Sequence, residues 1–373
     1  MAVMRRVRKT IFWLHLSAGL TAGVFIPLMG ITGVLLAYER QILAWQDGYE
    51  VEVSAGQGAR PLEEIVAKVM AAHPGAPLSG IARETGAGEL YVFSFGKEKQ
   101  FFVDPYAGDV LGEGSPKLRG FFAWVTGLHR WLALSQEQRK IGTNITGTAA
   151  LFFFFLVVSG LIVWWPRRWT WHHLKRIVLF QPRLHGPARD WNWHNVLGFW
   201  CCIPLTIITL SGAVIAFEWA NNLLFRAAGS EPPPAKSMSS GGGGGGGTPV
   251  SLAGLDRAWA LAESKAPQWE SISVRLPAKA GDAALFTISE SHRGRPDLKA
   301  SLSVDLATGQ EKVYETFDGY SRGRQWRLWA RWLHTGEAGG VWGQTLALFA
   351  AGGAVFLVWT GSALAWRRFR RRA

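Results

Sequence analysis

Two stretches of the chain, 179 residues apart, repeat one pattern of five residues that could do chemistry. The first stretch holds His15, Gly19, Pro27, Gly33 and Glu39, and the second holds His194, Gly198, Pro204, Gly212 and Glu218. Apolar residues fill the intervals, and an imidazole in such surroundings is a common ligand of haem iron. The first glycine of each stretch lies one helical turn beyond the histidine, where it would leave room for a flat porphyrin. The pattern therefore indicates haem ligation inside a helix bundle.

A second pair of histidines lies near the ends of two other apolar segments. His129 is found in TGLHRWLAL and His334 in ARWLHTGEAGG, and both sit beside arginine and tryptophan. A single histidine at a span end is often only an interfacial residue, although ionisable side chains at membrane depth usually mark a functional path. Because the repeat pairs all four histidines, we interpret them as two pairs of ligands.

Two b-type haems fit these pairs better than a metal ion does. His15 and Glu39 alone are separated by about 36 Å of helix, so pairs about a membrane apart cannot converge on one zinc ion. A haem takes one axial histidine on each face, and the sequence has no CxxCH motif for covalent attachment. We expect Gly19 and Gly198 to give clearance for the porphyrins. The candidate ligands of the propionates are Arg130 and Arg331 at one end of the bundle, and Arg8, Lys9 or Arg189 at the other.

The elements that must position these residues are four apolar segments, each long enough to cross a bilayer, which takes about 20 helical residues. They are Ile11–Ala37, Gly142–Trp165, Val196–Phe217 and Val341–Trp366. The first has a basic start like that of a signal peptide, but its apolar run is too long and no small-residue cleavage site follows. We therefore expect a polytopic membrane protein that retains all four helices.

The spans divide the chain into seven parts. Residues 1–39 form the first transmembrane helix, 126–166 the second with its histidine segment, 194–220 the third, and 326–373 the other histidine segment, the fourth helix and a basic tail. Two polar domains occupy residues 40–125 and 221–325, and residues 167–193 form a loop. A glycine run at residues 239–247 is expected to be a flexible connection within the second polar domain.

Basic residues gather in three segments that flank the spans: the N-terminal tail, residues 167–190 and the C-terminal tail. These segments hold 15 of the 40 basic residues and one acid, Asp190, whereas the rest of the chain is close to neutral. The positive-inside rule places them in the cytoplasm, with both termini, and places the polar domains outside. His15 and His194 then lie at the cytoplasmic side, and His129 and His334 at the outer side. Such charges do not form a nucleic-acid-binding face.

The two polar domains share one internal order. Each begins with a helical stretch, Leu62–Ala72 or Leu252–Ala266, and continues in short alternating strands. Each also contains a hairpin, FFVDPYAGDVLG or LSVDLATGQEKV, in which Asp104 and Gly108 match Asp305 and Gly309. An aspartate at the turn entry and a glycine with positive φ suit a tight strand connection. We therefore expect two small α/β domains.

The double unit of span, small α/β domain and span resembles the PepSY-associated transmembrane family. The similarity covers nearly the whole chain and rests on the motifs WLHLSAGLTAGVFIPLMGITGVLLAYE, GLHRWL, VVSGLIVWWPRR and VDPYAGDVLG. It implies an α-helical membrane protein with four transmembrane helices arranged as an internal repeat, plus two small periplasmic PepSY-like α/β domains. More narrowly, the chain resembles the bacterial inner-membrane di-haem siderophore reductases of that family.

This narrower resemblance implies two non-covalent bis-histidine haems, bound at His15, His129, His194 and His334, and reduction of a ferric siderophore in the periplasm with release of ferrous iron. The electrons would come from quinol or from a cytoplasmic or membrane donor, because the inner loop and tails have no room for a flavin or nicotinamide domain. Candidate contacts with the acceptor are Trp131, Trp332 and Arg327, at a depth where aromatic residues also serve as interfacial anchors.

Other interpretations stay open. His172 and His173, in the connection WTWHHLKRIVLF, would replace an inner ligand if the loop folds back, or would lie in an amphipathic interfacial segment. A haem-free regulatory or scaffold protein would instead use the outer domains to bind a peptide or a protease. A proton-coupled transporter is disfavoured, because no polar or ionisable residue is adjacent to Pro27 or Pro204.

Overall fold

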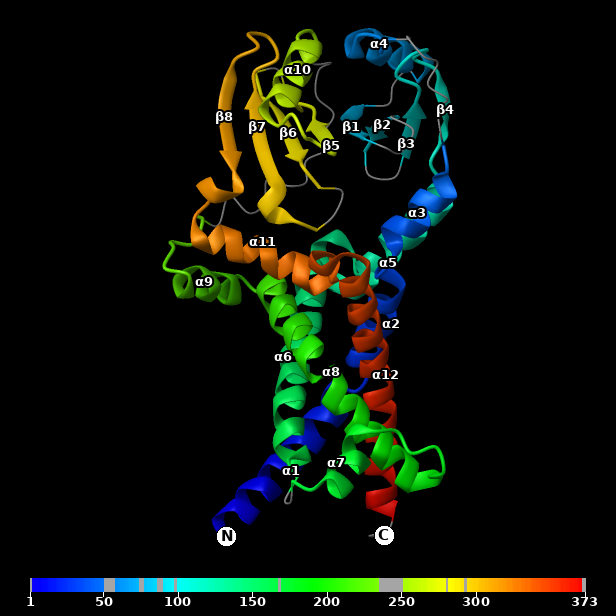
Figure 1. Ribbon diagram of the computed structural model, residues 1–373, viewed down its shortest axis with the longest axis vertical. Helices are drawn as coiled ribbons and strands as arrows, with labels where there is room; N and C mark the ends of the chain where they lie inside the picture. Colours follow the sequence, from blue (N-terminus) through cyan, green and yellow to red (C-terminus); the bar gives the residue numbers. More distant parts are fainter. Residues whose placement is uncertain are drawn as a thin grey trace. The chain divides into compact units, whose positions relative to one another are not determined.

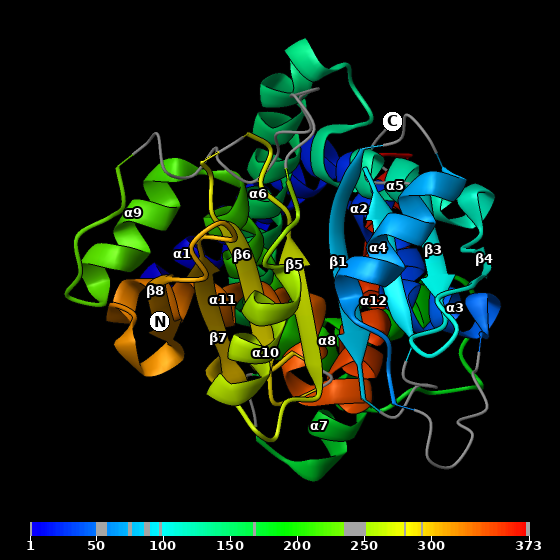
Figure 2. The same ribbon diagram turned by 90° about the horizontal axis from the view of Figure 1, so that it is seen from above.

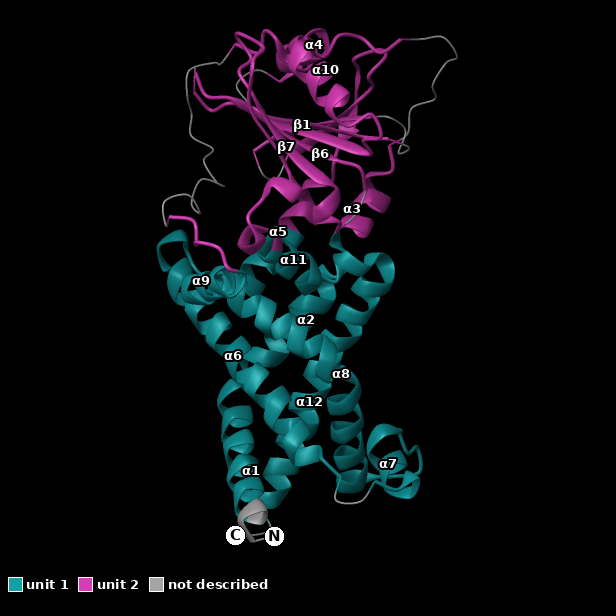
Figure 3. Cartoon of the chain, turned by 60° about the vertical axis from the view of Figure 1, so that its left-hand side comes forward, with its two compact units in different colours: residues 1–39, 122–228, 326–373 teal, residues 40–121, 229–325 magenta. Residues whose placement is uncertain are grey.

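The computed structural model describes residues 2–49, 58–73, 77–85, 90–96, 99–166, 169–234, 251–279, 281–291 and 294–370. The chain forms two compact units (Figure 3), of which the first comprises residues 1–39, 122–228 and 326–373 and the second residues 40–121 and 229–325. It passes between the units four times, as the alternation of apolar and polar regions requires. The glycine run at 239–247 and Arg167, Arg168, Arg371 and Arg372 lie outside the described residues.

The first unit is helical (Figure 1). Its helices are α1 (Ala2–Ala22), α2 (Phe25–Leu36), α6 (Arg139–Trp164), α7 (Trp171–Val178), α8 (Gly186–Ala216), α9 (Glu218–Ala227) and α12 (Gly340–Arg370). Two further helices, α5 (Pro116–Trp131) and α11 (Arg322–Thr335), begin in the second unit and end in the first. Among the described residues, three helical stretches are long and apolar enough to cross a membrane, and a bent pair of helices forms a fourth if it counts as one span.

The first predicted span is broken, so the expectation of one continuous helix over Ile11–Ala37 is wrong. α1 ends at Ala22 and α2 begins at Phe25, and the two halves of this span meet at an angle of 64°. Pro27 lacks an N–H and its ring clashes with the carbonyl four residues earlier, which belongs to the helix-weak Gly23. The repeat-related Pro204 lies inside α8, which continues unbroken, and the residue four before it is Trp200. The helix therefore breaks where the residue four positions before the proline is glycine, and it continues where that residue is tryptophan.

The four spans pack closely through small residues. α8 contacts both α6 and α12, whereas the broken first span places α1 against α6 and α2 against α12. A methyl group added at Gly30 would lie 2.8 Å from the carbonyl oxygen of Ala351, and one at Gly353 would lie 2.7 Å from the sulfur of Cys201. Small residues allow such close approach of helices in apolar surroundings. The free thiol of Cys201 is buried in this contact.

The second unit contains one antiparallel sheet of eight strands, in the order β4-β3-β2-β1-β5-β6-β7-β8 (Figure 2). The strands are β1 (Leu78–Glu84), β2 (Tyr91–Phe95), β3 (Lys99–Val103), β4 (Val110–Glu113), β5 (Ser271–Arg275), β6 (Ala284–Ser289), β7 (Lys299–Val304) and β8 (Glu311–Thr316). The two polar regions, described from sequence as separate domains, thus each supply four strands to a shared sheet. Ala82 of β1 pairs with Ser273 of β5 at the junction. Gly80 is required there, because a side chain would lie 2.7 Å from the carbonyl oxygen of Val274.

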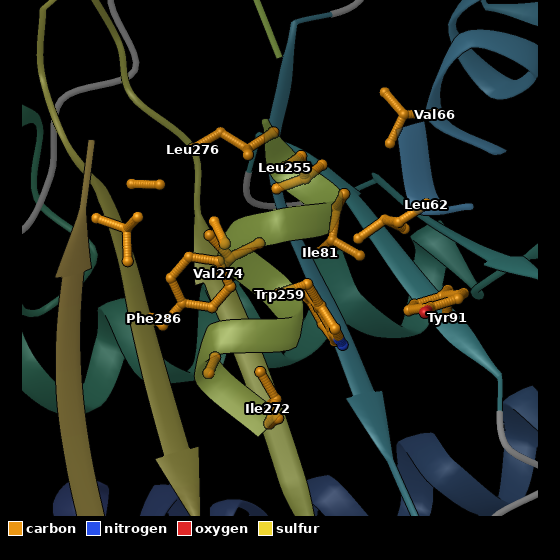
Figure 4. Packing of buried hydrophobic residues seen from close by; sticks show 14 of the residues in the cluster. Leu62, Val66, Ile81, Tyr91, Leu255, Trp259, Ile272, Val274, Leu276 and Phe286 are labelled. Atoms are coloured by element: carbon orange, nitrogen blue, oxygen red, sulfur yellow. The ribbon is translucent and has the colours of Figure 1, made fainter. Parts of the chain in front are cut away.

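Two helices cover this sheet, and the local features expected from the sequence are present. α4 spans Leu62–Ala72 as predicted, and α10 spans Leu255–Lys265, three residues shorter at its start than expected. Their apolar faces share one core with the strands (Figure 4), including Trp259 of α10 and Phe286 of β6. A third helix of this unit, α3, follows the first span at Glu39–Asp47.

Both predicted hairpins are confirmed. In the first, the Asp104 carboxylate accepts hydrogen bonds from the N–H groups of Tyr106 and Ala107, and Gly108 has a φ of +70°. In the second, Asp305 accepts bonds from the N–H groups of Ala307 and Thr308, and Gly309 has a φ of +69°. The two halves of the sheet therefore use identical turn chemistry.

The two covering helices cap one another. Oε1 of Glu63, in the first turn of α4, accepts hydrogen bonds from the N–H groups of Gly254 and Asp256, at 2.8 and 3.3 Å. The Asp256 carboxylate, in the first turn of α10, accepts bonds from the N–H groups of Leu62 and Glu63. A carboxylate at a helix N-terminus satisfies free N–H groups and interacts favourably with the helix dipole. This reciprocal exchange joins the two halves of the unit.

We expect Asp256→Ala to destabilise the second unit by about 1–2 kcal/mol, because free N–H groups at the start of α4 lose their acceptor. Thermal unfolding of the full chain in detergent, monitored by protease cleavage within the sheet, measures this loss of stability. Asp282→Ala, at an exposed loop position, is the matched control and should change stability by less than about 0.5 kcal/mol. Equal effects of the two variants would contradict the capping role.

Candidate functional site

His15 and His194 each lie against a hydroxyl and a glycine on a neighbouring helix. Nδ1 of His15, on α1, is 2.9 Å from Oγ of Ser159 on α6, and a methyl group added at Gly160 would lie 3.3 Å from its Cε1. Nδ1 of His194, on α8, is 3.0 Å from Oγ1 of Thr360 on α12. A methyl group at Gly361 would lie 3.2 Å from Cε1 of His194. The two histidines interact electrostatically, and we call them the first histidine pair.

His129 and His334, the second histidine pair, have surroundings of the same kind. Nδ1 of His129, near the end of α5, is 2.8 Å from Oγ1 of Thr32 on α2. Nδ1 of His334, near the end of α11, is 3.1 Å from Oγ of Ser211 on α8. The centroids of the two imidazole rings are 6.4 Å apart, and the ring planes are inclined at 65° in an edge-on arrangement. The structure therefore brings these two histidines, 205 residues apart in sequence, to one place.

Sharp turns after α5 and α11 hold the second histidine pair against the spans. Leu132 and Ala133, directly after α5, have positive φ angles of 57° and 52°, a conformation that non-glycine residues rarely adopt. The start of α6 then approaches so closely that a side chain at Gly142 would overlap the carbonyl of Trp131. After α11, Gly336 has a φ of +77° and packs directly on the backbone of Gly343. Both histidines are thus fixed by backbone contacts next to them.

A serine or threonine followed by glycine is the element that sequence reasoning missed. Each span contains one such dipeptide in contact with one histidine: Thr32-Gly33, Ser159-Gly160, Ser211-Gly212 and Thr360-Gly361. Of these residues, only Gly33 and Gly212 belong to the repeated sequence pattern. The sequence signal is a hydroxyl–glycine step in each apolar segment, in ITGVLL, VVSGLIV, LSGAVI and WTGSAL. It is not unique, because the second segment also contains Thr146-Gly147, which lies against Phe217.

The glycines singled out from sequence, Gly19 and Gly198, lie one turn from the first histidine pair but do not touch the rings. A methyl group at Gly19 would lie 3.7 Å from Cδ2 of Leu156, and one at Gly198 would lie 3.8 Å from Cδ2 of Leu357. These are ordinary van der Waals distances, so each position has room for about one further carbon atom.

The two histidine pairs lie at different depths of the bundle. His194 belongs to the first pair, and Ser211, which contacts a histidine of the second pair, lies 17 residues further along α8. This interval corresponds to about 26 Å of helix axis. Within the described residues, no group of three or more histidine, cysteine or acidic side chains could hold a metal ion. The four histidines therefore form two separate pairs.

Three arginines crowd beside the second histidine pair. Arg327 and Arg331 on α11 and Arg130 on α5 are close enough to repel one another, and burial together with the charges of Arg331 and Arg130 lowers the pKa of Arg327. In the part of the chain that the structure describes, none of the three forms an ion pair with an acid. Arg130 and Arg331 lie over the rings of Trp131 and Trp332, at 5.2 and 5.3 Å. Positive charge is therefore concentrated beside the second histidine pair.

The aromatic residues of this region differ in exposure. Trp131 is half-buried, whereas Trp332 is only 6% exposed. Of the two tryptophans expected to touch an external acceptor, Trp332 is therefore placed for packing, and Trp131 keeps part of its ring accessible.

The basic residues near the first histidine pair are more fully engaged. Arg8 donates to the carbonyl oxygens of Val163 and Trp165, at 3.0 Å for the latter. Arg189 and Arg367 both pair with Asp190, whose side chain is 1% exposed. Among the inner candidates for propionate binding, Arg8 and Arg189 therefore already have protein partners.

His172 and His173 lie on the exposed helix α7 and bond within their own loop. Nε2 of His172 is 2.8 Å from the guanidinium of Arg176, whose charge lowers the pKa of His172. Nδ1 of His173 is 2.6 Å from Oγ1 of Thr170. The buried amide of Asn192 fixes this loop by bonding main-chain groups of Arg176, Leu179 and Gln181. These contacts within the loop agree with the interpretation of this connection as an amphipathic segment at the surface.

Comparison with known families finds one match, and it spans almost the full sequence. Residues 12–371 match the family described as the PepSY-associated TM region. A search of curated proteins finds no match. The matched range contains all four histidines, the four hydroxyl–glycine steps that contact them and the whole eight-stranded sheet, so the chain belongs to the PepSY-associated TM family.

Proposed function

We propose that this protein binds two b-type haems, one at each histidine pair, and carries electrons across a bacterial inner membrane. The observation that carries this proposal is the 6.4 Å between the ring centroids of His129 and His334. A metal–imidazole bond of about 2 Å, with each ring centre about 1 Å behind its nitrogen, separates the two centroids of a bis-histidine site by about 6 Å. The observed spacing fits a metal held between the rings.

The chain's own residues suit haem at several points. Each histidine is held through Nδ1, which leaves the opposite nitrogen for an axial bond. The glycine beside each hydroxyl gives the ring a surface free of side chains. Arg130, Arg327 and Arg331 offer unpaired positive charge for propionates or for an anionic acceptor near the second pair. When bound, haem supplies reversible one-electron transfer, and the protein contributes ligation, orientation and charge.

The depth of the two sites supports transfer across the membrane. About 26 Å of helix separates them, close to the roughly 30 Å of a bilayer's hydrocarbon core. The basic residues gathered near the first pair favour a cytoplasmic location for that end, with both termini inside and the second unit in the periplasm. We propose that quinol or another cytoplasmic or membrane donor reduces the first site, and that the second site reduces a ferric siderophore in the periplasm.

A haem-free regulatory or scaffold role is the alternative that a specific observation favours. Among the described strands, β4 and β8 pair on one side only and so form the edges of the eight-stranded sheet. Such edges can accept an added peptide strand. Proton-coupled transport has less support, because the residues on both sides of Pro27 and Pro204 in the sequence are apolar.

The purified full chain should show the Soret band of low-spin, six-coordinate haem and contain two haems by pyridine haemochrome. His129→Ala or His334→Ala should remove the haem of the second site, and His15→Ala or His194→Ala that of the first, because each site loses an axial ligand. His172→Ala and His173→Ala are the matched controls and should retain two haems. A wild-type protein without haem would contradict the proposal.

Added methyl groups next to the imidazoles should have unequal effects on the second site. A methyl group at Gly212 would lie 3.2 Å from Cε1 of His334, whereas one at Gly33 would lie 3.8 Å from Cε1 of His129. We expect Gly212→Ala to displace the ring of His334 and to weaken haem binding about tenfold, as changes to residues that orient a metal ligand commonly do. Gly33→Ala should be tolerated. Haem titration of both variants measures the difference, and equal affinities would contradict it.

The acceptor is tested by anaerobic mixing of dithionite-reduced protein with ferric siderophores of different net charge. We expect reoxidation, and Arg327→Gln should slow it about tenfold with anionic chelates at low salt, because the arginine cluster attracts the acceptor. Arg226→Gln, on the exposed surface of α9, is the control for loss of one positive charge. Failure of every ferric siderophore to reoxidise the protein would point to another acceptor.

A further inference from the structure

Each hydroxyl that contacts a histidine also contacts a carbonyl in its own helix. Oγ of Ser159 is 2.6 Å from the carbonyl oxygen of Phe155, and Oγ of Ser211 is 2.6 Å from that of Ile207. The carbonyls that the two threonines bond are also four residues earlier, both at 2.7 Å: Leu28 for Thr32 and Phe356 for Thr360. All four hydroxyls therefore lie between a carbonyl oxygen and an imidazole nitrogen.

Counting hydrogens assigns the donors. A serine or threonine hydroxyl has one hydrogen to donate, and a carbonyl oxygen has none. The hydroxyl hydrogen is therefore used on the carbonyl, at the short distance typical of an O–H donor. The bond to the imidazole must then be donated by the ring, which requires a proton on Nδ1.

At His334 a second contact leads to the same assignment independently. Nδ1 of His334 is also 2.9 Å from the carbonyl oxygen of Ile208, an atom that can only accept. Ile208 lies three positions before Ser211, the hydroxyl residue of the same site. The helix turn before this hydroxyl–glycine step thus presents a second acceptor to the ring of His334.

We infer that all four histidines are held as the Nδ1-protonated tautomer and that Ser159, Thr360, Thr32 and Ser211 are the residues that hold them so. The lone pair of Nε2 is then directed away from the hydroxyl and is available to a metal. That the metal is haem iron rests on the proposed function, whereas the tautomer does not. These four hydroxyl residues are positioning residues that act through the imidazoles.

The contacts predict a graded effect of removing the hydroxyl. At His15 the hydroxyl of Ser159 is the acceptor that the structure shows, whereas at His334 the carbonyl oxygen of Ile208 remains when Ser211 is changed. Loss of an acceptor for Nδ1–H makes an imidazole a weaker electron donor and less well oriented, which weakens metal binding by about tenfold or more. Ser159→Ala should therefore weaken metal binding at the first site more than Ser211→Ala weakens it at the second.

The experiment combines histidine ¹⁵N NMR of the full chain in lipid with haem titration and spectroelectrochemistry of the same samples. In the haem-free wild-type protein, we expect the four paired histidines to give the signals of rings protonated at Nδ1. In Ser159→Ala we expect one ring to lose this preference, the affinity for one haem to fall about tenfold or more, and the midpoint potential of that haem to rise. Ser159→Thr, which copies the repeat-related residue, should restore all three values.

Thr209→Val is the matched control. Thr209 lies on α8 and donates to the carbonyl oxygen four residues earlier, that of Leu205, at 2.7 Å, as each positioning residue does in its own helix. Its hydroxyl bonds no histidine in the described part of the chain. Nε2–H signals from the buried rings, or a Ser159→Ala protein with unchanged signals, affinity and potential, would overturn the inference. A wild-type protein that binds no haem would instead refute the proposed function, while the nitrogen signals would still decide the tautomer.

Discussion

The constraint on which the first unit depends is the cost of placing polar imidazoles among apolar helices. A polar group removed from water without a hydrogen bond costs several kcal/mol in hydrocarbon, so each buried ring nitrogen needs a partner. Here one hydroxyl per span meets one histidine, at 2.8 to 3.1 Å in all four cases. The hydroxyl is itself satisfied by its own helix, so it adds no unpaired group. The glycine next to each hydroxyl lets the imidazole ring approach the helix backbone. The helix that carries the histidine can therefore pack closely on the helix that carries the hydroxyl.

The internal repeat is used differently in the two units. In the first unit each histidine pair takes one member from each half of the chain, so neither half could form a complete site. In the second unit the halves join edge to edge through β1 and β5, and their helices exchange carboxylate caps. Duplication thus yields a two-sided site in one unit and a continuous sheet in the other. A ligand that binds one imidazole on each face suits such a symmetric arrangement.

Charge is distributed unequally between the two histidine pairs. Near the first pair, Arg189 and Arg367 are neutralised by the buried Asp190, and Arg8 is bound to main-chain carbonyls. Near the second pair, Arg130, Arg327 and Arg331 have no acidic partner within the described residues and repel one another. Repulsion of this kind is a cost that an anion would relieve. Our proposal that an anionic acceptor is reduced at the second pair rests on this difference in charge.

The sequence by itself determined the spans, the repeat, the four histidines, the helix at Leu62–Ala72 and both Asp–Gly hairpins, because each depends on local hydropathy, spacing or turn chemistry. Only the tertiary structure decided that the span containing Pro27 breaks while α8 continues through Pro204, and that two polar regions share one sheet. The hydroxyl partners also emerged only there, since Ser159 and His15 are 144 residues apart. Contacts between distant segments depend on how whole helices and strands pack, which no local pattern specifies.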